Sequence, residues 1–333
     1  MNPMNPLKRR HWLASACALM ASGLALSTHA QGPGFPQAKP LSLVVPYAPG
    51  GPTDAMARTL ATAIRPVLGQ TMVVENKAGA GSNLGAEHVA RAEADGYTLM
   101  FGTSAPLAIN PYLYPKLNYD PARSFSPVIL IGYLPNVLVV HPSVPAHNVR
   151  ELIAHAKANK GRLSFASSGS GASSHLAGVM FNMQAGTDIQ HIPYKGTGPA
   201  LNDLLGGQVT MSFTDVLTAL PHIQSGKLRA IAVGSPQRVS MLPQVKTIAE
   251  QGFKGFDAVS WGGLVAPLGT PKDVVTRIDK ELGEILADKS VQDKLLTAGA
   301  MANYQNADQL AVRLKSDYEK WGKVIRDKGI GVD

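Results

Sequence analysis

The sequence contains very little cysteine. Its single cysteine, Cys17, lies within the first 30 residues, so a chain cleaved after Ala30 has none. Disulfide bonds, cysteine-based zinc sites and cysteine nucleophiles are therefore excluded from the cleaved chain. No basic run is interleaved with aromatic residues, which argues against nucleic-acid binding. Beyond residue 30, no apolar run is long enough to span a bilayer.

The usual signatures of catalysis are also lacking. A serine-hydrolase elbow needs G-x-S-x-G, and the candidate around Ser104 has Pro106 in place of the second glycine. No P-loop is present, the glycines near Gly169 do not complete a dinucleotide fingerprint, and no histidines have metal-ligand spacing. We therefore predict that the protein binds no cofactor and no metal and is not an enzyme. Residue types alone leave open a Ser104–His175–Asp215 triad in a periplasmic serine hydrolase.

The N-terminus has the three parts of a secretory signal peptide. Basic residues occupy positions 8–10, an uncharged apolar stretch covers 12–26, and a small-x-small cleavage signal ends at Ala30. The apolar stretch is shorter than a membrane span. We predict a signal peptide at 1–30, cleavage near Ala30 and a periplasmic location. Removal of three basic and no acidic residues lowers the formal net charge from +8 to +5, which would attract anions weakly.

After the signal peptide, short strand-like runs alternate with helical patterns. Strands are predicted at 41–45, 71–75 and 97–101, and helices at 53–68 and 82–94. In the first helix, apolar residues recur every four positions on one face, at Met56, Leu60, Ile64 and Leu68. Alternation of this kind with short connections predicts an α/β fold with a largely parallel sheet.

The pattern then changes in a way that predicts two lobes. Two apolar runs at 127–131 and 136–140 are interpreted as a strand that crosses between lobes. Further helices are predicted at 149–159, 175–184, 200–205, 271–287, 291–298 and 306–328, and strands at 163–166, 189–193, 209–213 and 228–233. A return crossing is expected between 253 and 267. We predict that lobe I comprises residues 31–133 and 254–333 and that lobe II comprises residues 134–253. A ligand cleft is expected between the two lobes.

Two loops share one design, in which small residues separate a strand from a helix. Pro46–Asp54 lies in predicted lobe I and Ser167–Ser174 in predicted lobe II. Glycines let backbone N–H groups turn toward one point, and the following helix adds unpaired first-turn N–H groups and its positive dipole end. Side chains at 53–54 and 173–174 are expected to cap these helices. The two loops predict an anion clamp, although glycine and serine are also ordinary turn residues.

A third loop of this kind spans Tyr194–Pro199. Lys195 would neutralise a carboxylate and Tyr194 would donate a hydrogen bond to it. A solvated lysine and a half-buried tyrosine are the alternative interpretation.

Other polar residues follow predicted strands at the edge of the cleft. Asp215 would accept from a ligand ammonium or hydroxyl group, or else cap the turn that follows it. Ser104 and Asn110 are candidates on the same reasoning. Among the histidines, only His175 is expected near the cleft, and a structural role for it is equally compatible with the sequence.

Six segments form an ordered set of motifs from about Leu41 to the C-terminus. They are VVPYAPGGPTDAMAR, VVENKAGAGSNLGAEHVARAEADGYTLMFGTS, AINPYLY, SFASSGSGASSHLAG, IPYKGTGPALNDLLGGQVTMSFTD and SGKLRAIAV. This set resembles the Bug-type solute receptors of tripartite tricarboxylate transporters. The resemblance implies the type 2 periplasmic-binding-protein fold, with two α/β lobes, two crossing strands and a cleft that closes on ligand. It also implies that Tyr47–Asp54 and Ser167–His175 hold a ligand carboxylate, partly through backbone amides and bridging water.

The predicted function follows from these patterns and the resemblance together. The candidate ligand-binding residues are Tyr47, Pro49, Gly50, Gly51, Thr53, Asp54, Ser104, Asn110, Ser167, Ser168, Gly169, Gly171, Ala172, His175, Tyr194, Lys195, Gly196 and Asp215. We predict a monomeric protein that captures a small carboxylate by lobe closure and delivers it to membrane permease subunits. The resemblance implies di- or tricarboxylates, acidic amino acids or aromatic acids, nicotinate-like ones included, as ligands. A ligand-sensing receptor for a membrane sensor kinase is the alternative.

Two departures from the family flank the inferred cleft. Pro52 stands where a small residue is frequent, and Ala105-Pro106-Leu107 replaces a common Gly-Thr-His. These departures bear on the identity of the ligand, which stays open, more than on the fold.

Overall fold

Two mixed β-sheets with helices on their faces form the part of the chain that the structure describes. The computed structural model describes residues 34–194 and 196–331. The predicted signal peptide at 1–30 and the predicted ligand-binding residue Lys195 lie outside the described residues.

In the described part of the chain, the first sheet has six strands in the order β11-β4-β10-β3-β1-β2. They are β1 (Leu41–Val45), β2 (Met72–Asn76), β3 (Thr98–Thr103), β4 (Phe125–Leu134), β10 (Ser260–Pro267) and β11 (Met301–Asn306). β1 pairs in parallel with β2 and β3, whereas β10 and β11 pair antiparallel with β4. Because β1 and β3 are parallel neighbours, the loops that follow them leave the sheet at the same edge.

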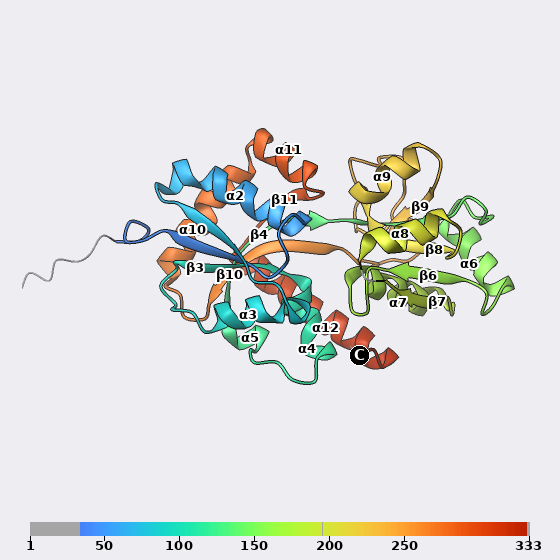
Figure 1. Ribbon diagram of the computed structural model, residues 1–333, viewed down its shortest axis with the longest axis horizontal. Helices are drawn as coiled ribbons and strands as arrows, with labels where there is room; N and C mark the ends of the chain where they lie inside the picture. Colours follow the sequence, from blue (N-terminus) through green and yellow to red (C-terminus); the bar gives the residue numbers. More distant parts are fainter. Residues whose placement is uncertain (1–33, 195, 332–333) are drawn as a thin grey trace, which may run out of the picture. The chain divides into compact units, whose positions relative to one another are not determined.

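Helices cover both faces of the first sheet (Figure 1). One face packs against α2 (Pro52–Leu68), α10 (Lys272–Leu286) and α11 (Lys289–Thr297), and the other against α3 (Asn83–Ala90) and α12 (Ala307–Lys328). Alternation along β1 directs Leu43 to the first face and Val44 to the second. The predicted apolar face of α2 is buried at Met56, Leu60, Ile64 and Leu68. Each such burial contributes about 1.5–3 kcal/mol.

The second sheet has five strands within the described residues, in the order β7-β6-β8-β5-β9. They are β5 (Asn136–Val140), β6 (Ser164–Ser167), β7 (Gln190–Pro193), β8 (Met211–Asp215) and β9 (Arg229–Val233). One face packs against α6 (Val149–Ala158) and α7 (Ser173–Ala185), and the other against α8 (Thr197–Leu205) and α9 (Val216–Gln224). β6 is parallel to both β7 and β8, so the loops after these three strands emerge at one edge.

The chain crosses from one sheet to the other where the sequence predicts it. β4 ends at Leu134, and β5 begins at Asn136 after a single intervening proline. On the return, residues up to Ala258 still pack in the core of the second sheet, and the chain enters β10 at Ser260, within the predicted crossing at 253–267. Asn136 Nδ2 donates to the carbonyl of Ala258 at 3.2 Å, which joins the outgoing and returning segments. The lobe boundaries at 133/134 and 253/254 stay a prediction.

The last helix, α12, connects the two cores. Its residue Leu310 is buried in the cluster on the first sheet. Further along, Trp321 and Ile325 are buried in the cluster that contains Phe181 of α7. Residues from both ends of α12 are thus buried, each in a different core.

Several element predictions were wrong in detail. The sheets are mixed rather than largely parallel, because both crossing strands pair antiparallel with their neighbours. The strand expected at 209–213 lies at Met211–Asp215, so Asp215 ends that strand instead of following it. The helix expected at 82–94 covers only Asn83–Ala90, and neither β11 nor α9 was predicted. The remaining short elements are η1 (Ala80–Ser82), η2 (Ala105–Ile109), α4 (Asn110–Leu113), α5 (Pro121–Ser124) and η3 (Ala249–Gln251).

Candidate functional site

The first predicted loop connects β1 to α2. α2 begins at Pro52 with Gly51 as its N-cap residue, and no side chain caps it. The prediction that Thr53 or Asp54 caps this helix is wrong, because both residues lie within its first turn. Gly50 has a φ of 86°, a conformation that glycine adopts without steric cost. The N–H groups of Gly51, Thr53 and Asp54 have no acceptor among the described residues, so this helix start is free to receive an anion.

The carboxylate of Asp54 is fully engaged inside the protein. One oxygen accepts from the Gly50 N–H at 2.9 Å and from Arg58 Nε at 2.9 Å, and the other accepts from Asn76 Nδ2 at 2.9 Å. The Arg58 hydrogen bond lowers the pKa of Asp54 to about 2, with Gly50 and Asn76 adding to it and burial opposing it. We therefore expect Asp54 to shape the loop rather than to bind the ligand itself.

Tyr47 and Pro49 occupy different positions in the same loop. Pro49 is exposed. The Tyr47 hydroxyl lies 2.6 Å from Thr103 Oγ1 at the end of β3, and the Tyr47 carbonyl accepts from Asn76 Nδ2 at 3.1 Å. Burial raises the pKa of Tyr47, so its phenol stays neutral at pH 7. The hydroxyl links the loop after β1 to the end of β3.

The segment after β3 is buried. Ser104 is 2% exposed and Asn110 is 4% exposed. The amide of Asn110 donates to the Gly81 carbonyl at 2.8 Å and to Asn83 Oδ1 at 2.6 Å. Asn110 thus holds the neighbouring turn, and its donors are not directed at a ligand.

That neighbouring turn was not among the predicted site residues. Ala80 and Ser82 have φ values of 47° and 81°, in the left-handed region that non-glycine residues adopt at a cost of about 1–2 kcal/mol. The only sequence signal was the run of small residues in KAGAGSN, which indicates a turn and no particular conformation.

The second predicted loop connects β6 to α7, with Ala172 as the N-cap residue. The prediction that Ser173 or Ser174 caps α7 is wrong, because both residues lie within the helix and no side chain caps it. Ser174 Oγ instead accepts from the Ser168 N–H at 3.0 Å. The N–H groups of Ser173 and Ser174 have no acceptor in the described part of the chain. As in the first loop, the helix start is available to an anion.

Two histidines lie beneath this loop. The Gly171 N–H donates to Nδ1 of His175 at 3.0 Å, so this amide faces inward. Ser167 Oγ lies 2.6 Å from Nε2 of His191, and the Gly169 N–H donates to the same hydroxyl at 3.2 Å. His191 was not among the predicted residues, and His175 contacts the loop from inside.

The third predicted loop lies beside the second. The N–H of Tyr194 donates to the Ser167 carbonyl at 3.0 Å, and the N–H of Gly196 donates to the Ser168 carbonyl at 3.1 Å. The Tyr194 hydroxyl donates to Asp203 Oδ2 at 2.7 Å, and burial, with Asp203 adding to it, raises the pKa of Tyr194 to about 12. Its hydroxyl proton is therefore committed to Asp203.

A small polar pocket collects the residues at this edge of the second sheet. It has a volume of about 20 Å³, close to that needed by one water molecule. It is lined by Asn136, Ser168, Ser173, Ser174, Thr197, Ala200, Ser212, Phe213, Thr214 and Asp215. α7, α8 and α9 all begin at this edge. Of the predicted site residues, Ser168 and Asp215 line the pocket, and most of the others in it were missed.

Two side chains in this pocket have unsatisfied or perturbed polar groups. Thr214 is 4% exposed, and its Oγ1 has no hydrogen-bond partner among the described residues. Burial raises the pKa of the Asp215 carboxyl, and a hydrogen bond with Thr197 opposes this rise. Asp215 is the N-cap residue of α9, but its side chain makes no capping hydrogen bond, so the capping alternative is wrong. Both groups suit a bound water molecule, which a pocket of this volume can hold.

The structure also brings the second predicted loop against the segment after β3. A Cβ placed on Gly171 would lie 2.4 Å from Leu113 Cδ1, so the loop after β6 touches the segment after β3. Gly171 has a φ of 76°, which, with this contact, disfavours a larger residue. A direct meeting of Tyr47–Asp54 with Ser167–His175 stays a prediction.

Comparison with known proteins identifies the family. Residues 56–330 match the TctC family, described as "Tripartite tricarboxylate transporter family receptor". The chain belongs to this family. It is 38% identical to Protein BugT of Bordetella pertussis over 88% of this chain and 90% of that protein. R. palustris Rpa4515 with adipate is 34% identical, with a TM-score of 0.76, over 90% of this chain and 100% of that one. MatC from Rhodopseudomonas palustris with bound malate is 32% identical, with a TM-score of 0.72, over 87% of this chain and 100% of that one.

Membership in the TctC family confirms the predicted family and fold class. The similar structures are periplasmic binding proteins with two α/β lobes, and the chain is a solute-binding protein rather than an enzyme. TctC proteins are periplasmic receptors. No helix in the described part of this chain is long and apolar enough to cross a membrane.

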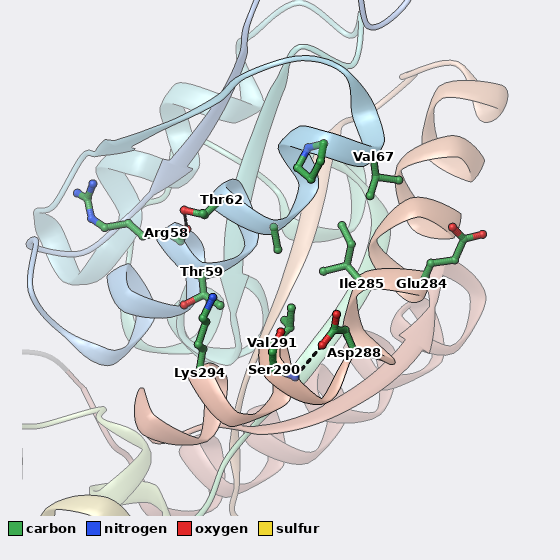
Figure 2. A pocket seen from close by; sticks show the side chains of 12 residues that line it. Arg58, Thr59, Thr62, Val67, Glu284, Ile285, Asp288, Ser290, Val291 and Lys294 are labelled. Atoms are coloured by element: carbon green, nitrogen blue, oxygen red, sulfur yellow. Dashed lines mark hydrogen bonds between the residues drawn. The ribbon is translucent and has the colours of Figure 1, made fainter.

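A roomier pocket of this TctC chain is lined by none of the predicted site residues. It has a volume of about 650 Å³ and lies where α2 meets α10 and α11 (Figure 2). Its lining includes Arg58 and Lys294 as well as Glu284 and Asp288, so it has no single charge sign to select an anion. The small pocket at the β6–β8 edge is the better candidate for ligand recognition.

Proposed function

We propose that this TctC receptor captures a small carboxylate between its two lobes and delivers it to the membrane subunits of a tripartite transporter. The predicted lobes, 31–133 plus 254–333 and 134–253, would close on the ligand. The helix starts at Pro52 and Ser173 would each offer unpaired N–H groups to an anion. Export by the predicted signal peptide would place the receptor in the periplasm.

One observation carries this proposal, namely the group of helix starts around the small polar pocket at the β6–β8 edge. Three helices begin there, and helix starts favour negative charge. The hydroxyl of Thr214 is buried without a partner, as expected for a group that completes its hydrogen bonds with ligand or ligand-bound water. The glycine loop from Gly169 to Gly171 adjoins this pocket through Ser168.

Two similar structures support the ligand class. The structure of Rpa4515 is that of its complex with adipate, and the structure of MatC is that of its complex with malate. Both ligands are small dicarboxylates, and this chain is 34% and 32% identical to those proteins. Malate and adipate are therefore the first probes for this receptor.

A thermal-shift screen of the cleaved chain tests the proposal. Mono-, di- and tricarboxylates, including malate and adipate, are each added at about 100 times an assumed Kd, which stabilises a one-site protein by about 2.7 kcal/mol. We expect one class to raise the Tm by roughly 5 °C. The matched control is the uncharged diamide of the same acid, which should leave the Tm unchanged. A panel with no carboxylate-specific shift would contradict the proposal.

A further inference from the structure

A pair of stacked imidazoles lies directly under the loop that follows β6. The rings of His175, in the first turn of α7, and His191, in β7, are nearly parallel, with centroids 3.7 Å apart and planes 10° apart. Phe165 of β6 stacks on His191 at 4.9 Å. His175 is 6% exposed. His175 therefore lies beneath the loop rather than on its solvent side, and His191 beside it is half-buried.

Each imidazole contacts a different glycine of the loop. His175 accepts directly from the Gly171 N–H through Nδ1. His191 reaches Gly169 through Ser167, whose hydroxyl lies against Nε2 of His191 and both accepts from the Gly169 N–H and donates to its carbonyl. The two glycines have positive φ values of 142° and 76°, which glycine adopts without steric cost, and their N–H groups are the ones that these contacts engage.

We propose that His175 and His191 are positioning residues that hold the backbone from Ser167 to Gly171 in the form that receives the ligand. This inference rests on the proposed function, because the loop is one side of the proposed carboxylate site. Neither imidazole is proposed to contact the ligand. The inference also explains why two histidines occur so close together without a metal-ligand pattern around them in the described chain.

The contacts define the protonation state that the loop requires. Nδ1 of His175 accepts a hydrogen bond and so carries no proton, which leaves the proton of a neutral ring on Nε2. The groups facing the two rings are Phe165 and Ser167 from β6 and the Gly171 amide from the loop. In the described chain no carboxylate or other charged group hydrogen-bonds or ion-pairs with either imidazole.

Both rings are accordingly held neutral. Burial, with the neighbouring His191 adding to it, lowers the pKa of His175 to about 4, and burial lowers the pKa of His191 to about 4. Two charged rings at this separation would also repel each other. Protonation of His175 would replace its acceptor with a donor facing the Gly171 N–H, and the loop would lose that contact.

Two substitutions at His175 separate positioning from simple packing. His175→Phe keeps a stacking ring but removes the acceptor, whereas His175→Asn offers an amide oxygen near the position of Nδ1. We expect His175→Phe to weaken malate or adipate binding about tenfold, because one buried N–H loses its acceptor, and His175→Asn to stay within about threefold of wild type. His88→Phe, at an exposed position on α3, is the matched control and should bind as wild type does.

Calorimetry on the cleaved chain and an NMR titration of its histidine ring protons give the decisive results. Wild-type affinity in His175→Phe, or equal losses in His175→Phe and His175→Asn, would overturn the inference alone. Should His175→Phe fail to fold, the wild-type titration decides, because ring signals of both residues titrating near 6.5 would also overturn it. If wild type binds no carboxylate at all, the proposed function fails and the inference fails with it.

Discussion

At the scale of single residues, the polar side chains chosen from the sequence mostly organise the loops from within. Asp54, Asn110 and His175 each use their hydrogen-bonding groups on neighbouring backbone or side chains. Sequence reasoning can place such residues near a loop, because strand ends and helix starts are visible as patterns. The sequence does not show whether a side chain points toward the ligand or toward the protein, because that depends on partners such as Asn76 and His191, which lie on other strands.

Asp54 allows a direct test of this organising role. Asp54→Asn should lower the free energy of unfolding at pH 7 by about 1–2 kcal/mol, because a buried carboxylate paired with Arg58 and the Gly50 N–H loses its charge. The pKa of Asp54 falls from 3.8 to about 2 on folding. The stabilisation is therefore full above pH 3.8 and is lost as pH falls toward 2.

Urea denaturation of wild type and Asp54→Asn at pH 7 and pH 3 checks this. The difference between the two proteins should shrink at pH 3. Asp293→Asn, which breaks an exposed ion pair with Lys289, is the control and should cost less than about 0.5 kcal/mol at either pH. A difference for Asp54→Asn that is the same at both pH values would contradict the carboxylate's role.

At the scale of elements, patterns with a buried face were predictable and patterns without one were not. The strand at 41–45 and the helix beginning near Thr53 carry strong apolar periodicity, and both are found. β11 reads Met-Ala-Asn-Tyr-Gln-Asn, an edge strand without buried residues, and α9 contains Pro221, which disfavours a helix. Pairing direction was missed because it depends on distant strands and not on local sequence.

The loop after β1 is an element whose backbone can be tested by a matched pair of glycines. Gly50 and Gly186 have φ values of 86° and 60°, and a Cβ at either position meets no atom within 4 Å. Each change to alanine should therefore cost about 1–2 kcal/mol from the left-handed conformation alone. Only Gly50→Ala should also weaken malate or adipate binding, by roughly tenfold, because relief of this strain would shift the N–H of residue 50 away from Asp54, beside the proposed anion site.

Calorimetric affinities and thermal unfolding of the two variants provide the measurement. We expect the two variants to lose similar amounts of Tm. Only Gly50→Ala should bind the carboxylate more weakly than wild type. If Gly186→Ala, at the C-terminal end of α7, weakened binding to the same extent, the loop conformation would not be what sets the affinity.

At the scale of the whole molecule, the sequence predicts the crossings between sheets but not what supports them. The two apolar runs at 127–131 and 136–140 are a local signal, and the structure places them in β4 and β5. The support comes from α12, whose contribution is long-range. Asp317 of α12 accepts from Trp261 Nε1 of β10 at 2.7 Å and from Arg313 Nε at 3.0 Å. Arg313 also donates to Asp257, just before β10 begins, at 2.9 Å.

This charged network argues for a strong effect from a single change at the crossing. Asp317 is 1% exposed and carries the only carboxylate in the described chain that contacts Trp261, Arg313 and Lys320 together. Asp317→Ala would leave the Arg313 guanidinium and the Trp261 N–H buried without this partner. Loss of one member of a buried ion pair costs about 3–5 kcal/mol.

The matched control lies on the same helix. Asp327→Ala removes an exposed carboxylate that pairs with Lys323, and it should cost under about 1 kcal/mol. Urea denaturation of both variants at pH 7 measures the difference, and equal losses would show that α12 does not support the crossing through Asp317.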